Sequence, residues 1–395
     1  MYYDNIELFE KYKGQIVKYD AILIDEIQDY HRNWMVILKT FFRDPEGDYV
    51  LFGDVKQNIY GQPTERKDVV TNVRGVNELK YCFRSDFKVR DLAQSFQRNI
   101  FQDKYDVDDM SENETFFGQT LEKEGYINYM MLSNENQIVA LYNIIRGNIL
   151  NKNSSISPND ITILGYTTKL LRTFDAYYRH ASREKTNSML ETVEVMYMTH
   201  LNYLGKNLQE SNPNYGWFKN ITDHFKKTIF PKRSQLYDND YITIRQHVAK
   251  LFTIYDLYNT YSDTFETNMN EECIRCHIPL EAFKAFRNHY SESLDFFKQE
   301  VHKDSYKQIR DNKKLHFWMN SGTIKISTIN SFKGWESEVV FLIIEPKYEW
   351  GNTFNQAFDE LLYTGLTRCK QNLIIINFGN TEYDAKIRPL INSIK

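Results

Sequence analysis

Two adjacent carboxylates, Asp25 and Glu26, directly follow the apolar run Ala21-Ile22-Leu23-Ile24 and are the side chains best placed for chemistry. Such a pair can divide one task at a phosphate. We expect Asp25 to hold Mg²⁺, through water, and Glu26 to orient and deprotonate the attacking water. The apolar run favours a strand buried in a parallel sheet, and open α/β sheets bind ligands at the carboxyl ends of their strands. The sequence therefore predicts half of a phosphate-hydrolysis site at this edge.

A second acid follows the next predicted strand. The apolar pattern from Trp34 to Phe42 has helical spacing, and the residues 44–48 (Asp-Pro-Glu-Gly-Asp) predict a turn. The short strand Tyr49–Phe52 then ends at Gly53-Asp54. The order strand, acid, helix, strand, acid predicts two steps of a parallel sheet that bring both acids to the same edge.

The composition limits the classes of protein to consider. A chain of 395 residues with 42% hydrophobic and 15% aromatic residues can form two or three packed domains. Its formal net charge of −4 means that any nucleic-acid binding must come from a local basic groove. The polar first ten residues do not resemble a signal peptide, and no apolar run is long enough to cross a membrane. We therefore expect a cytoplasmic protein without a membrane partner.

The rest of the chain alternates between strand and helix patterns, with one long helical stretch. We expect a helix after a cap at Ser85 or Asp86, and a second helix over residues 137–150. Residues 102–124 predict an exposed loop, and residues 181–319 predict an α-helical insertion. The predicted strands of this second α/β unit are residues 125–130, 161–164, 324–328, 339–344 and 373–376.

The four cysteines do not form a disulfide framework. Cys273 and Cys276 are spaced like metal ligands and precede His277, but a structural zinc site needs four ligands. The remaining cysteines, Cys82 and Cys369, lie far away in sequence. We interpret Cys273 and Cys276 as ordinary helix-surface or core residues.

Five segments, in order along the chain, together resemble motifs of the UvrD/Rep-type superfamily 1 DNA helicases. They are Ile24–Asp29 (motif II, the Walker B strand and its acids), Phe52–Tyr60 (motif III), Tyr81–Ser85 (motif IV), Ile326–Glu336 (motif V) and Leu362–Lys370 (motif VI). The resemblance implies an α/β fold of RecA-like parallel-sheet lobes of the P-loop NTPase type. It implies ATP and Mg²⁺ as cofactors, and single-stranded or partly duplex DNA as a partner. Movement from 3′ to 5′ on the single strand is implied by analogy alone.

The resemblance also implies roles for individual residues. Gln57 would report the γ-phosphate to the nucleic-acid side, and Arg84 and Arg368 would stabilise charge on the transferring phosphoryl group. Glu336 would contact the ribose. The residues implied in nucleic-acid binding are Tyr60, which could also be a core aromatic, Thr328 and Asn330. Asn330 replaces the histidine that is usual in motif V, and an amide cannot carry that proton.

The Walker A motif of the family, Gly-x-x-x-x-Gly-Lys-Ser/Thr, has no counterpart before Asp25. One Gly-Lys pair occurs, Gly205-Lys206, without the preceding glycine or the following hydroxyl. Three explanations stay open: a fragment of a longer protein, one half of a split helicase completed by another polypeptide, or a catalytically incomplete module that binds nucleic acid or protein. We predict negligible ATPase activity from this chain alone, and a missing N-terminal half supplied in cis or in trans.

The predicted organisation follows from these motifs. Residues 1–83 form an incomplete first RecA-like lobe, and residues 84–180 begin the second. Residues 181–319 are its helical insertion, and residues 320–395 complete it. Basic residues beside aromatics, over 226–233 and 303–314, suit a single-strand track or, alternatively, ordinary solvated helix faces. The sequence thus favours the C-terminal part of an ATP-dependent DNA helicase or translocase.

Overall fold

The computed structural model separates the chain into two compact units. Unit 1 comprises Met1–Asn134, Asp160–Tyr166 and Ile329–Lys395, and unit 2 comprises Glu135–Asn159 and Thr167–Thr328. The structure describes residues 4–60, 84–108, 125–132, 136–151, 156–207, 209–211, 215–300, 302–346 and 357–394. Most of the segment expected to be motif IV, residues 81–83, and most of the expected loop over 102–124 lie outside these described residues.

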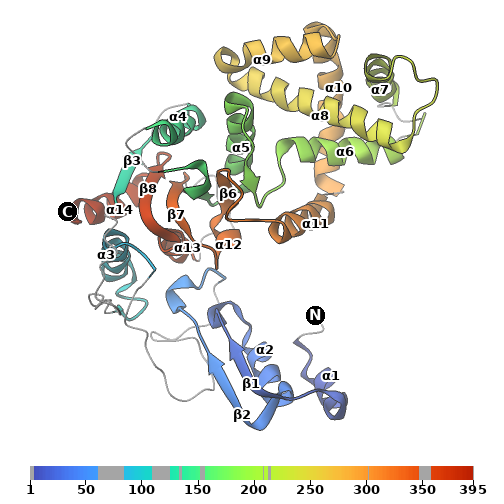
Figure 1. The fold of residues 1–395 in the computed structure, drawn as a ribbon. Helices are drawn as coiled ribbons and strands as arrows, with labels where there is room; N and C mark the ends of the chain where they lie inside the picture. Colours follow the sequence, from blue (N-terminus) through green and yellow to red (C-terminus); the bar gives the residue numbers. More distant parts are fainter. Residues whose placement is uncertain are drawn as a thin grey trace. The chain divides into compact units, whose positions relative to one another are not determined.

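Unit 1 begins with a two-stranded parallel sheet. Strand β1 (Tyr19–Ile24) pairs with β2 (Arg43–Leu51), so that Leu23 lies opposite Val50. Helix α2 (Arg32–Ile37) continues into a π-helical turn, Leu38–Phe42, and connects the two strands (Figure 1). A short helix, α1 (Ile6–Lys11), precedes β1 and is capped by the side chain of Asn5.

The predicted turn over residues 44–48 falls within the bounds of β2, but the strand is irregular there. The register moves from Tyr19–Arg43 to Ala21–Asp48, so residues 44–47 have no partners on β1, and the backbone N–H of Glu46 donates to Asp44 Oδ1 at 3.0 Å. A Cβ atom at Gly47 would lie 2.6 Å from the backbone oxygen of Asp20, so only glycine permits the close approach at which this irregular segment returns to β1. The turn residues therefore form a local irregularity between two paired parts of one strand.

The main sheet has six strands in the order β3-β8-β7-β4-β6-β5, and the pairings of β3 with β8, β8 with β7, β7 with β4 and β5 with β6 are parallel. The strands are β3 (Ile127–Met131), β4 (Ile161–Gly165), β5 (Asn187–Ser188), β6 (Lys325–Thr328), β7 (Ser337–Ile344) and β8 (Cys369–Asn377). The apolar runs of β7 and β8 are buried, as expected for central parallel strands. This architecture confirms the predicted α/β fold class and is consistent with a RecA-like lobe.

Strands β3, β4, β7 and β8 belong to unit 1, and β5 and β6 to unit 2. Within its described residues, unit 1 has four helices that follow β2 in the chain. They are α3 (Phe87–Phe96), which runs into a π-helical turn at Gln97–Phe101, α12 (Ile329–Phe332), α13 (Phe358–Leu366) and α14 (Thr381–Ser393). Asp86 caps α3 by accepting a hydrogen bond from the backbone N–H of Lys88. The capping residue predicted at 85 or 86 is thus Asp86.

Unit 2 is mainly helical. Its helices are α4 (Gln137–Leu150), α5 (Thr168–Ser182), α6 (Val193–Asn207), α7 (Tyr215–Ile229), α8 (Asp238–Thr260), α9 (Ser262–Arg275), α10 (Leu280–Glu300) and α11 (His302–Leu315). Aromatic side chains such as Phe225, Phe252 and Tyr290 fill the core between α6 and α10. The predicted helix over 137–150 is confirmed. Within the described residues, no helix is long and apolar enough to span a membrane.

Candidate functional site

The acid pair lies in a strained turn at the end of β1. The backbone N–H of Phe52 donates to the carbonyl of Ile24 at 2.8 Å, and the N–H of Ile27 donates to the carbonyl of Phe52 at 3.0 Å. The intervening residues Asp25 and Glu26 therefore bulge out of the pairing. Glu26 has a left-handed backbone, with φ of 55°, which is uncommon for a residue other than glycine. Strain of this kind persists where the surroundings enforce it, and it is frequent at functional sites.

A buried glutamine fixes the carboxylate of Glu26. The side chain of Gln28 is fully buried and donates from Nε2 to Glu26 Oε2 at 2.5 Å. Its Oε1 accepts a hydrogen bond from the backbone N–H of Asp54 at 3.1 Å. This bond connects the Asp25-Glu26 turn after β1 to the residues that follow β2. The sequence analysis gave Gln28 no role. The pattern that could have indicated one is a side-chain amide two residues after Glu26, the predicted general base.

Gln57 is held between an acid and an arginine. It closes the short 3₁₀ turn Val55–Gln57 after β2, and its Nε2 donates to Asp54 Oδ2 at 3.0 Å. Its Oε1 accepts from Arg368 Nη2 at 2.9 Å. The orientation of the Gln57 amide is therefore fixed at both ends. The structure thus brings together two predicted site residues that are 311 positions apart.

Arg368 is a buried cation in an otherwise acidic neighbourhood. Only 2% of the residue is exposed. Burial lowers the pKa of its guanidinium, the nearby Arg84 lowers it further, and the acids Glu26, Glu336 and Asp54 oppose this change. Because arginine keeps its proton at any accessible pH, this lowered pKa means that the fold carries the charge at a cost. A buried charge held at a cost is frequent at catalytic sites.

Arg84 and Glu336 form an ion pair with each other. Arg84 Nε lies 2.5 Å from Glu336 Oε1, and the two side chains are 46% and 28% exposed. The sequence assigned these residues separately, to the phosphate and to the ribose. In this structure each neutralises the other, so a nucleotide that used both would have to replace this contact.

Lys333 is a site residue that the sequence interpretation missed. Its ammonium group lies 2.7 Å from Asp29 Oδ1 and 3.3 Å from Glu26 Oε2, and it donates to the carbonyl of Gln57 at 3.1 Å. The side chain is only 7% exposed. Burial raises the pKa of Asp29, and the hydrogen bond and charge of Lys333 counteract that rise. Lys333 thus connects the acid turn after β1 to the backbone of the turn after β2.

The three residues expected to bind nucleic acid have different surroundings. The ring of Tyr60 is exposed, in contrast to a core aromatic. Asn330, on α12, has a buried Oδ1 with no hydrogen-bond partner among the described residues. Thr328, at the end of β6, is nearly buried. An exposed ring and an unmatched amide oxygen are groups that a ligand can engage.

The two basic segments contain arginines with structural partners. Arg310 donates two hydrogen bonds, at 2.6 and 2.7 Å, to the fully buried carboxylate of Glu191, which also pairs with Arg172 at 2.7 Å. Burial by itself raises the pKa of Glu191, but the bonds from Arg310 and the charge of Arg172 hold it below its usual value. Arg233 is likewise paired with Asp240. These arginines stabilise unit 2 rather than extend as free cations.

The acid turn has the oxygen donors that Mg²⁺ prefers. Asp25 is exposed, and one of its oxygens accepts the backbone N–H of Glu26 at 2.9 Å, which leaves the second carboxylate oxygen for a cation or its water. Glu26 is engaged by Gln28 and Lys333 and is less suited to direct coordination. The Asp25 carboxylate is thus of a type that could hold Mg²⁺, and this role stays a prediction.

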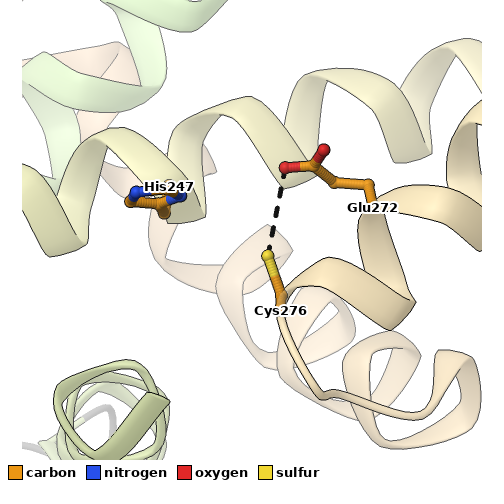
Figure 2. Close-up of side chains that lie close together, drawn as sticks. All are labelled: His247, Glu272 and Cys276. Atoms are coloured by element: carbon orange, nitrogen blue, oxygen red, sulfur yellow. Dashed lines mark hydrogen bonds between the residues drawn. The ribbon is translucent and has the colours of Figure 1, made fainter. Parts of the chain in front are cut away.

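A second group of metal-ligand residue types lies in unit 2, between α8 and the end of α9. Figure 2 shows His247, Glu272 and Cys276 converging, with the thiol of Cys276 donating to Glu272 Oε1 at 3.9 Å. Glu272, however, already pairs with Arg275 and with Lys250 at 3.3 Å. Arg275 Nη2 also lies 3.3 Å from His247 Nδ1. Because a guanidinium already neutralises the carboxylate, this cluster is an ion-pair network between two helices and does not fit a metal.

Comparison with known proteins gives one distant relative, and no protein-family model matches the chain. The chain is 22% identical to the "ATP-dependent DNA helicase HMI1, mitochondrial" of Saccharomyces cerevisiae (strain ATCC 204508 / S288c), over 95% of its own length and 63% of that protein. It therefore spans less than two thirds of the relative's length. The similarity is distant, and it supports a helicase-like protein.

Proposed function

We propose that this chain is the C-terminal part of an ATP-dependent DNA helicase or translocase of the UvrD/Rep type. The observation that carries the proposal is the convergence of the Asp25-Glu26 acid turn, Gln57 and Arg368 in unit 1. Glu26 is oriented by Gln28 at 2.5 Å, and Gln57 is bonded to Arg368 at 2.9 Å. An oriented base, a polar sensor and a buried guanidinium are the parts that phosphoryl transfer to water requires.

Each residue has a proposed task in ATP hydrolysis. Glu26 accepts the proton of the attacking water, and Arg368 stabilises the charge that develops on the phosphoryl group. Gln57 connects the phosphate to the nucleic-acid side, and Asp25 is the residue that would hold Mg²⁺, which neutralises phosphate charge when bound. When a nucleotide binds, the ion pair between Arg84 and Glu336 would break, so that Arg84 contacts the phosphate and Glu336 contacts the ribose.

DNA is the proposed polymer partner. The distant relative is described as an ATP-dependent DNA helicase. The exposed ring of Tyr60 is suited to stack on a base, whereas the unmatched Oδ1 of Asn330 is buried and would accept a hydrogen bond from a base only after a rearrangement that exposes it. Thr328 is a third proposed contact. The phosphate cradle comes from a P-loop-bearing segment outside this chain, in the same polypeptide or in another.

The test compares ATPase activity with and without that segment. The chain alone should show negligible turnover, with or without single-stranded DNA, whereas the completed assembly should hydrolyse ATP and be stimulated by the strand. Glu26→Gln in the same assembly is the matched control for contaminating ATPases. DNA-stimulated turnover of order 1 per second by the chain alone would contradict the need for a P-loop segment. Strand binding by an assembly that never hydrolyses ATP would favour the binding-module alternative.

A further inference from the structure

Lys56 is a buried cation in the turn that carries Gln57, and the proposed hydrolysis gives it no task. Its side chain is only 6% exposed, and its ammonium group lies 2.6 Å from Asp108 Oδ1. Lysine is almost never buried without a partner, because an unpaired ammonium group is costly to remove from water. Asp108 is this partner, although it lies 52 positions further along the chain, beyond α3. The ion pair therefore connects the turn after β2 to the segment after α3.

Asp108 is in turn held by a fully buried glutamine. Gln97, in the π-helical turn after α3, donates from Nε2 to Asp108 Oδ2 at 3.0 Å, and its Oε1 accepts the backbone N–H of Asp108 at 2.9 Å. The same Nε2 donates to the hydroxyl of the buried Tyr363, on α13, at 2.7 Å. An amide that uses its two donors and its acceptor has one orientation. Gln97 thus fixes the position of Asp108 relative to α13.

These contacts return to the proposed site. Thr364 follows Tyr363 on α13, and its carbonyl accepts a hydrogen bond from Arg368 Nε at 3.2 Å. Arg368 Nη2 donates to Gln57 Oε1 at 2.9 Å, and Gln57 directly follows Lys56 in the chain. The contacts close a polar ring, which consists of Lys56, Asp108, Gln97, Tyr363, Thr364, Arg368 and Gln57. Buried polar networks of satisfied groups make the structure around them rigid.

Lys56 also acts on the acid that holds Gln57. The backbone N–H of Lys56 donates to Asp54 Oδ1 at 2.9 Å, and Gln57 Nε2 donates to Asp54 Oδ2 at 3.0 Å. Burial raises the pKa of Asp54, and the charge of Lys56 opposes this rise. Because an ionised carboxylate accepts hydrogen bonds more strongly than a neutral one, the ammonium group favours the form of Asp54 that keeps the amide of Gln57 in place.

We propose that Lys56 and Asp108 are positioning residues of the proposed hydrolysis site, and that their ion pair closes the polar ring that holds Gln57 against Arg368. The inference rests on the proposed function. Neither residue touches the nucleotide, and each acts through Gln57. An arginine stabilises the transferring phosphoryl group only while it is correctly oriented. Opening the ring should therefore slow the chemical step and leave the binding of ATP unchanged.

The first experiment measures coupling within the chain alone. Lys56→Met keeps much of the volume, and Asp108, whose side chain is 47% exposed, stays accessible to water, so the variant should fold. Urea unfolding is followed for Lys56→Met, for Arg368→Met and for the double variant. Effects of independent sites on the unfolding equilibrium constant multiply to within about twofold. If the ring exists, the effect of Lys56→Met should be about fivefold or more smaller once Arg368 is already methionine.

The control for this coupling is Lys13→Met. Lys13 belongs to the same unit, is half-exposed and forms an ion pair with Glu10 at 3.2 Å. Its replacement should combine with Arg368→Met without coupling. Circular dichroism checks that each variant is folded.

The second experiment measures ATPase activity in the assembly completed by a P-loop-bearing segment. Lys56→Met and Tyr363→Phe open the ring at two different places, and the second removes only a hydroxyl group. Each should lower kcat about tenfold or more, since small misplacements of catalytic groups have effects of this size. The KM for ATP should stay within about twofold of the wild-type value. Lys56→Arg, which keeps the charge, should restore most of kcat, and Lys13→Met should behave like the wild type.

The inference is overturned if Lys56→Met and Arg368→Met act independently in the chain. It is also overturned if Lys56→Met and Tyr363→Phe both leave kcat unchanged, or if activity falls through KM alone. The two experiments separate this inference from the proposed function. Coupled substitutions in an assembly that never hydrolyses ATP refute only the proposed function. Independent substitutions in an assembly that does hydrolyse ATP refute only the positioning role.

Discussion

Replacing Arg368 by methionine should separate the stability of the fold from the activity of the site. Arg368 donates to Gln57 Oε1 at 2.9 Å and to the carbonyl of Thr364 at 3.2 Å, and it is almost fully buried. Methionine keeps much of the volume and removes the charge. The substitution thus tests whether the guanidinium is there for packing or for chemistry.

The magnitude follows from two opposing contributions. Arg368 also donates to Thr367 Oγ1 at 3.3 Å, so three hydrogen bonds from a charged donor are lost, each contributing up to about 1.5–3 kcal/mol. Against this, burying an ion costs several kcal/mol, and that cost disappears. The lowered pKa of Arg368 indicates that the burial cost exceeds the attractions. Since the arginine stays charged at every accessible pH, its cost is present throughout. We expect the free energy of unfolding of Arg368→Met to be unchanged or up to about 2 kcal/mol higher.

Urea unfolding of the chain measures the first quantity. Arg388→Met is the control, because Arg388 is half-exposed and pairs with Asp384 at 2.8 Å on one helix. Losing that solvent-exposed pair should change the free energy of unfolding little. In the assembly that hydrolyses ATP, Arg368→Met should lower turnover about 10³-fold or more. Arg368→Lys should restore little of the lost turnover, because a lysine ammonium cannot replace the planar guanidinium with its several N–H donors. A loss of stability above about 2 kcal/mol or near wild-type turnover would refute the reasoning.

Three further outcomes are expected. In the complete assembly, Glu26→Gln should abolish hydrolysis while a fluorescent ATP analogue still binds, and normal turnover would exclude Glu26 as the base. Lys333→Met should lower the free energy of unfolding of the chain by about 2 kcal/mol at pH 7, and by less as the pH falls through the raised pKa of Asp29, where the carboxylate loses its charge; equal losses across that range would contradict this. Glu191→Gln should cost about 3–5 kcal/mol at pH 7. Because the folded pKa of Glu191 is depressed, that stability is present above the unfolded value of about 4.3 and should be lost as the pH falls through the folded value; pH-dependent urea unfolding of wild type and variant decides it.

The fold was predictable where local pattern and tertiary environment agree. The helix over 137–150 and the apolar strands β7 and β8 were confirmed because their periodicity reflects burial on one face or on both. The segment 44–48 is a mixed case, because it lies within the bounds of β2. Its proline, glycine and acids favour a turn, and residues 44–47 interrupt the register with β1, whereas pairing resumes at Asp48. Two-residue β5 is too short to leave a periodic pattern.

The sequence indicated which residue types could form the candidate site, but it did not indicate which of those residues contact one another. Asp25 and Glu26 could be chosen because two carboxylates follow a predicted strand, whereas the role of Gln57 was implied only by the family resemblance. Lys333 lies within the segment that resembles motif V, but its contact could not be predicted, because its partner Asp29 lies 304 residues away.

The Arg84–Glu336 pair shows why such partners matter for mechanism. Considered separately, Arg84 could bind a phosphate and Glu336 could bind a ribose. In this structure Arg84 Nε lies 2.5 Å from Glu336 Oε1, so the two side chains form an ion pair with each other. Arg84 also contributes to lowering the pKa of Arg368. A nucleotide that separates the pair would move a charge beside Arg368, so occupation of the site would change the electrostatic environment of the guanidinium that Gln57 holds. In the proposed site, nucleotide binding and the orientation of Arg368 would thereby be linked through one ion pair.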